Sequence, residues 1–137
     1  MIYLDTSAFL KTVNDEPESA ALEAYLRGIG SARFVSSALL AVEARRGALR
    51  SRPGLVPRVD LALAGVVQLE ITEQVIESAR RLPDPLLRSL DAIHLATALL
   101  IRDDVDVLLT YDERLASAAA AHHLPTAAPS ARPTRPA

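Results

Sequence analysis

The chain has 137 residues, of which half are hydrophobic, and it carries 15 basic and 17 acidic side chains. This length suits one domain with one core, and the net charge of −2 excludes a protein that coats nucleic acid by overall basic charge. Because cysteine is absent, disulfides, thiolate catalysis and cysteine-based zinc sites are excluded. No basic leader opens the chain and no apolar run approaches the roughly 20 residues of a membrane span, so we expect a cytoplasmic protein.

The first third of the chain predicts two strands separated by helices. Residues 2–4 form a short apolar run that ends at Asp5, followed by hydroxyl residues, which is typical of a strand that opens into a helix. A second helix begins around residues 15–18 and ends near Gly30. Residues 33–35 then predict the second strand.

The middle of the chain continues this alternation. Ser36 and Ser37 are expected to cap a helix over residues 38–50, and Glu43 is embedded in the apolar first half of this helix. Pro57 is expected to open a further helix through residue 64. A third strand over 66–69 and a helix beginning at Thr72 complete this part.

The last third repeats the pattern of the first strand. Ser89 is expected to cap a helix over residues 90–101, with Asp91 in its first turn. A fourth strand over 105–110 ends in Thr110 and Asp112, as the first strand ends in Asp5.

The C-terminal part is expected to hold a helix to about residue 122, an edge strand over 124–127 and a tail over 129–137. Strands that alternate with helices predict a three-layer α/β/α sandwich with a short, mainly parallel sheet. We therefore expect one domain over residues 1–128.

Four acids occupy positions where chemistry gathers in such a sheet. Ligands bind beyond the carboxyl ends of parallel strands, where Asp5 and Asp112 lie, and Glu43 and Asp91 are placed to converge on the same edge. Oxygen ligands without cysteine or paired histidine favour Mg²⁺ or Mn²⁺. Such ions serve phosphodiester hydrolysis when three or four carboxylates offset their charge.

Four segments of the chain resemble, in order and spacing, the signatures of PIN-domain ribonucleases, and most closely those of the VapC toxins of bacterial toxin–antitoxin pairs. They are IYLDTSAFLK, SSALLAVEARRG, LDAIHLATAL and LLTYDERLASAA. The resemblance covers residues 1–125. Each segment alone is weak evidence, whereas the last two together are quite specific.

The resemblance implies a metal-dependent endoribonuclease. In such a protein Asp5, Glu43, Asp91 and Asp112 would ligate Mg²⁺ or Mn²⁺, and they would be the catalytic residues. Thr6 and Thr110 would line the site through their hydroxyls. The resemblance also implies an RNA substrate, a VapB-like antitoxin that blocks the site, and a homodimer.

Each acid also has an ordinary structural interpretation. Asp5, Asp91 and Asp112 could cap helices or complement helix dipoles, and Glu43 could pair with a neighbouring arginine. For His94, one helical turn after Asp91, we favour a hydrogen-bonded structural residue over a metal ligand.

The basic residues allow two interpretations as well. Arg45, Arg46 and Arg50 follow Glu43, and a second cluster spans residues 80–88. Such clusters are either solvated faces or contacts to RNA phosphates. Lys11, the only lysine, is expected to be exposed.

Two other functions remain open. An aspartyl phosphatase would place a second aspartate two residues after Asp5, where this chain has Ser7. A non-catalytic PIN-like module that binds protein or RNA would not need all four acids.

Overall fold

The computed structural model describes residues 1–130, so most of the tail expected over 129–137 lies outside the described residues. Within residues 1–130 the strands form one parallel sheet in the order β3-β2-β1-β4-β5. The strands are β1 (Ile2–Leu4), β2 (Phe34–Ser37), β3 (Val66–Leu69), β4 (Val107–Leu109) and β5 (Thr126–Ala127).

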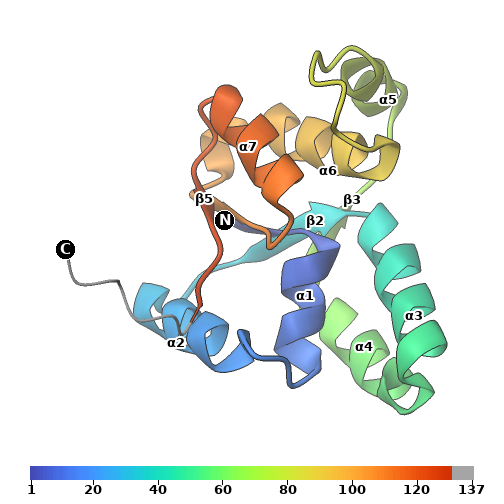
Figure 1. Cartoon of the computed structure of the whole chain (residues 1–137), viewed down its shortest axis with the longest axis vertical. Coiled ribbons are helices and arrows are strands. Elements are labelled where there is room, and N and C mark those ends of the chain that lie inside the picture. Colours follow the sequence, from blue (N-terminus) through green and yellow to red (C-terminus); the bar gives the residue numbers. More distant parts are fainter. Residues whose placement is uncertain (131–137) are drawn as a thin grey trace.

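Helices cover both faces of the sheet, which confirms the α/β sandwich (Figure 1). On one face lie α1 (Thr6–Val13), α2 (Ser19–Ile29), α3 (Leu39–Ser51) and α4 (Val56–Leu63). On the other face lie α5 (Glu73–Arg80), α6 (Ser89–Leu100) and α7 (Glu113–Ala121).

The alternation of side chains along β1 divides the core into two parts. Ile2 and Leu4 belong to a cluster with Phe9 of α1, whereas Tyr3 belongs to a second cluster with Leu95 of α6. Successive side chains of a strand point to opposite faces of its sheet, so the central strand is buried on both sides. Such two-sided burial explains why β1 is apolar until Asp5.

Two of the expected helix caps are wrong. Ser36 and Ser37 belong to β2, and Ala38 holds the cap position of α3. The Ser36 hydroxyl donates to the Leu4 carbonyl oxygen of the neighbouring strand at 2.6 Å, and the Ser37 hydroxyl accepts from the Leu39 backbone N–H at the start of α3 at 3.1 Å. Ser89 is the first residue of α6, and the cap position belongs to Arg88, whose side chain makes no capping bond. A serine that can bond a neighbouring strand need not cap the next helix.

The strand order places a switch point between β1 and β4. From β1 the chain moves outward to β2 and β3, whereas β4 and β5 lie on the other side of β1. In open parallel sheets the crevice beyond such a switch point is where ligands bind. No helix within residues 1–130 is long and apolar enough to cross a membrane.

Candidate functional site

Asp5 forms the corner between β1 and α1. Its Oδ1 accepts hydrogen bonds from the Ala8 backbone N–H at 2.8 Å, which caps α1, and from the Ser7 hydroxyl at 2.7 Å. Its Oδ2 accepts a hydrogen bond from the Thr110 hydroxyl. Asp5 is only 3% exposed, and burial raises the pKa of its carboxyl in spite of these donors.

Asp112 forms the matching corner between β4 and α7. Its Oδ1 accepts hydrogen bonds from the backbone N–H groups of Arg114 and Leu115, both at 2.9 Å, and so caps α7. Its Oδ2 lies 3.8 Å from the guanidinium of Arg88. Asp5 and Asp112 can therefore cap a helix and belong to the site at the same time, because only one oxygen of each carboxylate serves the cap.

Two hydroxyls join these corners across the switch point. The Thr110 hydroxyl donates to Asp5 and accepts from the Asp112 backbone N–H at 3.0 Å. The Ser7 hydroxyl donates to Asp5 and accepts from the Tyr111 backbone N–H at 3.0 Å. The structure thus places the Thr110 hydroxyl between the two corners and adds the Ser7 hydroxyl beside it.

Glu43 reaches the same edge of the sheet from α3. Its Oε1 accepts hydrogen bonds from the Thr6 hydroxyl at 2.8 Å and from Nε2 of His94 at 2.7 Å. Burial pushes the pKa of this carboxyl upward, but the bonds from His94 and Thr6 outweigh burial, so the pKa is lowered. His94 is a buried, hydrogen-bonded residue, which agrees with the interpretation that we favoured.

Asp91 lies in the first turn of α6. Partial burial raises the pKa of its carboxyl, and repulsion from Asp112 and Asp5 raises it further. This repulsion places Asp91 within electrostatic reach of both corners. A cation among these groups would relieve it.

One cavity of about 270 Å³ brings three of the four acids together. Glu43, Asp91 and Asp112 line it, together with Arg88, while Asp5 lies buried outside the lining. Within residues 1–130, no three acidic or histidine side chains are grouped closely enough to hold a metal ion as they stand. The four carboxylates are thus neighbours around the switch point, and their ligation of an ion stays a prediction.

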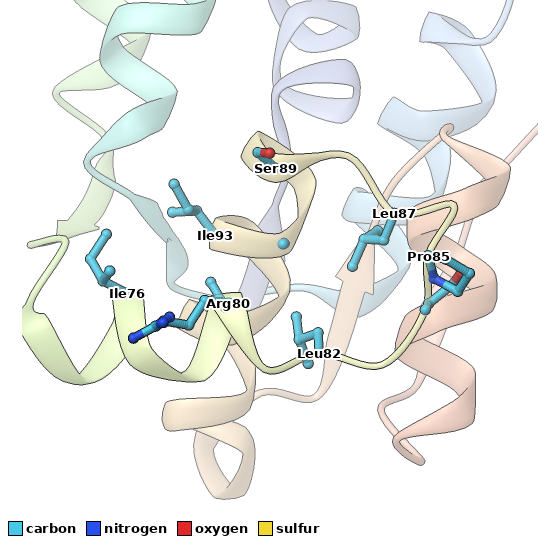
Figure 2. Close-up of a pocket in the computed structure, with 10 residues that line it drawn as sticks. Ile76, Arg80, Leu82, Pro85, Leu87, Ser89 and Ile93 are labelled. Carbon is cyan, nitrogen blue, oxygen red and sulfur yellow. The ribbon is translucent and has the colours of Figure 1, made fainter.

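A second cavity of about 420 Å³ adjoins this edge between α5 and α6 (Figure 2). Leu82, Leu87 and Ile93 surround it, and Arg80 lies along its side (Figure 2). Ser89 lines this cavity and the acid cavity. None of the four acids lines the larger cavity, so it offers no ligand for a cation from that set.

The arginines differ in their surroundings. Arg45, Arg46 and Arg50 of α3 are all exposed, and Arg45 also pairs with Asp60 at 3.2 Å. Arg88 alone among the basic residues lines the acid cavity within the part of the chain that the structure describes. The sequence does place Arg88 directly before the helix that carries Asp91, and this position could have identified Arg88 as a residue of the site.

The expectation that Lys11 is exposed is wrong. Its side chain is 13% exposed and pairs with Glu16 at 3.0 Å and Glu18 at 3.1 Å. Its ammonium also lies 4.9 Å from the ring centre of Tyr111, a favourable cation–π contact. Two acids and an aromatic ring from later parts of the chain therefore cover this lysine.

Comparisons with known proteins agree with this geometry. The model of the PIN domain matches residues 2–121. Ribonuclease VapC35 of Mycobacterium tuberculosis is 42% identical over 131 residues, which cover 94% of this chain and 97% of the relative.

Two solved structures share the fold. The crystal structure of Mycobacterium tuberculosis VapC20, described as a sarcin-ricin loop cleaving toxin, matches with a TM-score of 0.71 at 14% identity and covers 86% of this chain and 95% of that chain. VapBC2 from Rickettsia felis, bound to a promoter DNA fragment, also matches with a TM-score of 0.71 at 14% identity, over 95% of this chain and 100% of that chain. On the family match and the identity to a VapC ribonuclease, the chain belongs to the PIN-domain family and, within it, to the VapC ribonucleases.

Proposed function

We propose that this chain is the toxin of a toxin–antitoxin pair and hydrolyses RNA phosphodiester bonds with a divalent cation, Mg²⁺ or Mn²⁺, held by Asp5, Glu43, Asp91 and Asp112. One observation carries the proposal. Carboxylates from α3, α6 and the β4–α7 corner line a single cavity at the switch point of the sheet, beside the buried Asp5. The ribonuclease names of the relatives support the substrate class.

The donor set suits such a cation. All four groups offer oxygen atoms, which hard cations prefer, and repulsion among acids already raises the pKa of Asp91. When bound, an ion of this class lowers the pKa of a water molecule and stabilises negative charge on phosphate oxygens. Repulsion among neighbouring acids destabilises the fold, so a functional role explains their proximity better than a structural role does.

The protein's own groups would prepare this site in three ways. Thr110 holds Asp5, and Thr6 holds Glu43, through hydroxyl donors. Arg88 places a guanidinium beside the acids, where it can bind a phosphate oxygen of RNA. Arg46 and Arg50 would extend contact along the RNA backbone from α3.

We also propose a VapB-like antitoxin as the partner of this chain and a homodimer as its assembly. The fold shared with VapBC2 of Rickettsia felis supports the antitoxin partner. Leu90, which lines the acid cavity and is 48% exposed, supports a protein interface there. Two further exposed apolar residues lie beside lining residues in the sequence: Val42, 59% exposed, precedes Glu43, and Leu86, 68% exposed, lies two residues before Arg88. Light scattering of the isolated chain tests the homodimer, and RNA cleavage with and without the antitoxin tests the partner.

The experiment that tests the activity compares wild type with Asp5→Asn on labelled RNA, with Mn²⁺ or with EDTA. We expect cleavage by wild type with Mn²⁺ to fall by more than about 100-fold in the variant, since even residues that merely support metal ligands are worth about 10- to 100-fold. Asp103→Asn, at an exposed site, is the matched control. Equal cleavage by the variant, or cleavage in EDTA, would overturn the proposal, and RNA binding without cleavage would favour a binding module.

A further inference from the structure

A chain of hydrogen bonds, Glu43–His94–Tyr3, leads from the acid cavity into the core of the protein. Nε2 of His94 lies 2.7 Å from Oε1 of Glu43, and Nδ1 of the same ring lies 2.9 Å from the Tyr3 hydroxyl. Glu43 belongs to α3, His94 to α6 and Tyr3 to the central strand β1. Two hydrogen bonds thus connect three elements that are distant in the sequence.

The chemistry of the carboxylate determines which group donates and which accepts in each of these hydrogen bonds. The Glu43 carboxylate, when ionised, can only accept, so Nε2 of His94, 2.7 Å from Oε1, carries the proton and donates. In the neutral ring Nδ1 is then an acceptor, and the Tyr3 hydroxyl donates to it. Glu43 therefore sets the tautomer, and the Tyr3 hydroxyl holds the other side of the ring through Nδ1.

Burial makes this arrangement rigid. Tyr3 and His94 are 0% and 1% exposed, and their rings meet edge to face with centres 5.9 Å apart. Thr6 donates to the same Oε1 atom. Within residues 1–130, the other oxygen, Oε2, has no protein donor, so two donors fix one oxygen and leave the second for a ligand.

We propose that Tyr3 and His94 are positioning residues that hold Glu43 with Oε1 bound to the protein and Oε2 directed to the cation site. The proposal rests on the function proposed above. Neither residue touches the cation: His94 acts through Glu43, and Tyr3 acts through His94. Groups that orient the ligands of a metal typically account for about 10- to 100-fold in metal affinity.

Substitutions of His94 separate positioning from packing. The amide of Gln reaches the place of Nε2 and can donate to Glu43, whereas the shorter Asn reaches only the place of Nδ1, and Leu fills space without a donor. We expect His94→Gln to bind Mn²⁺ nearly as tightly as wild type. His94→Leu and His94→Asn should bind about 10- to 100-fold more weakly.

Tyr3→Phe tests the hydrogen bond between Tyr3 and His94 with less risk to folding. It keeps the buried ring and removes one hydroxyl, so the expected loss of Mn²⁺ affinity is smaller, below about 10-fold. Tyr25→Phe, in α2, removes a hydroxyl that makes no hydrogen bond within the described residues and is the matched control. His122→Gln, at the end of α7, is the control for the histidine substitutions.

The readout is the dissociation constant of Mn²⁺, measured by the electron paramagnetic resonance signal of the free ion, for variants whose thermal unfolding in EDTA shows a folded protein. Wild-type affinity in Tyr3→Phe and in every folded His94 variant would overturn the positioning role while leaving the proposed function intact. Equal losses in His94→Gln and His94→Leu would also overturn it. A wild-type protein that neither binds Mn²⁺ nor cleaves RNA would contradict the proposed function, and this inference with it.

Discussion

The corners at Asp5 and Asp112 follow the same plan but differ in how far water reaches the carboxylate. In each, an aspartate follows a central strand and caps the next helix with Oδ1. Asp5 is 3% exposed, and protein donors hold both of its oxygens. The side chain of Asp112 is 25% exposed, and its Oδ2 has only the distant Arg88 as a partner within residues 1–130.

This difference shows that similar local sequences can give carboxylates with different tasks. The buried corner is rigid, and its charge is unfavourable unless a cation is near. The open corner is partly hydrated, so water solvates its charge. Substitutions at the two corners should therefore have unequal effects on stability, although both aspartates belong to the proposed site.

The largest difference is expected between Thr110→Val and Ser7→Ala. Thr110→Val removes the only protein donor to Asp5 Oδ2 within residues 1–130 and leaves the Asp112 N–H without its acceptor. We expect a loss of about 1 to 3 kcal/mol in the free energy of unfolding and about 10- to 100-fold in RNA cleavage. Ser7→Ala also leaves a backbone N–H, that of Tyr111, without its acceptor, but Asp5 Oδ1 stays bonded to the Ala8 N–H, so the expected loss is smaller, nearer about 1 kcal/mol. Urea unfolding measures both, and equal losses would contradict the account.

At the open corner, two substitutions separate the helix cap from the site. Asn is as good a cap as Asp, so Asp112→Asn should keep the stability of α7, whereas Asp112→Ala should cost about 0.5 to 2 kcal/mol. Both should abolish RNA cleavage, because both remove the charge. If Asp112→Asn still cleaves RNA and only the destabilised Asp112→Ala loses activity, Asp112 serves as a helix cap and not as a site residue.

The repulsion of Asp91 by the two corners should make the stability of the protein depend on pH. Burial and repulsion raise its pKa in the folded protein, so its contribution to stability is full below the unfolded pKa of about 3.9 and is lost as pH rises through the folded pKa. Without metal, Asp91→Asn should be more stable than wild type near pH 7 by about 0.2 to 1 kcal/mol, the size of interactions between partly solvated charges. The gap should close toward pH 4, whereas Asp103→Asn should show no such trend.

The smallest effect is expected outside the corners, at Arg46. In an Asp5→Asn background, in which we expect no cleavage, Arg46→Ala should weaken binding of single-stranded RNA. It should also reduce the slope of log K against log salt by about 0.7 for each phosphate that the variant no longer binds. Arg27→Ala, on α2 and paired with Glu23, is the control. An unchanged slope would mean that Arg46 belongs to a solvated face.

The sequence predicted the strand ends at Asp5 and Asp112, because a short apolar run that stops at an acid is a local signal. It could not order the strands. It also could not show that Oδ1 of each aspartate caps a helix while Oδ2 of Asp5 bonds to Thr110 and Oδ2 of Asp112 lies toward Arg88. The Tyr3–His94 contact joins residues 91 positions apart, and no local pattern encodes it. One of the groups that cover Lys11 was hidden for the same reason, since Tyr111 comes from a distant part of the chain, whereas the ion pairs of Lys11 with Glu16 and Glu18 are local and were missed.

The central claim is that the two corners, Glu43 and Asp91 form one cation site. The most direct measurement is an anomalous difference map from crystals of the wild-type protein soaked in Mn²⁺. The account predicts a peak in the cavity that Glu43, Asp91 and Asp112 line, with carboxylate oxygens of these residues and of Asp5 as its ligands. A peak bound by other residues, or crystals that bind Mn²⁺ nowhere near these acids, would contradict it.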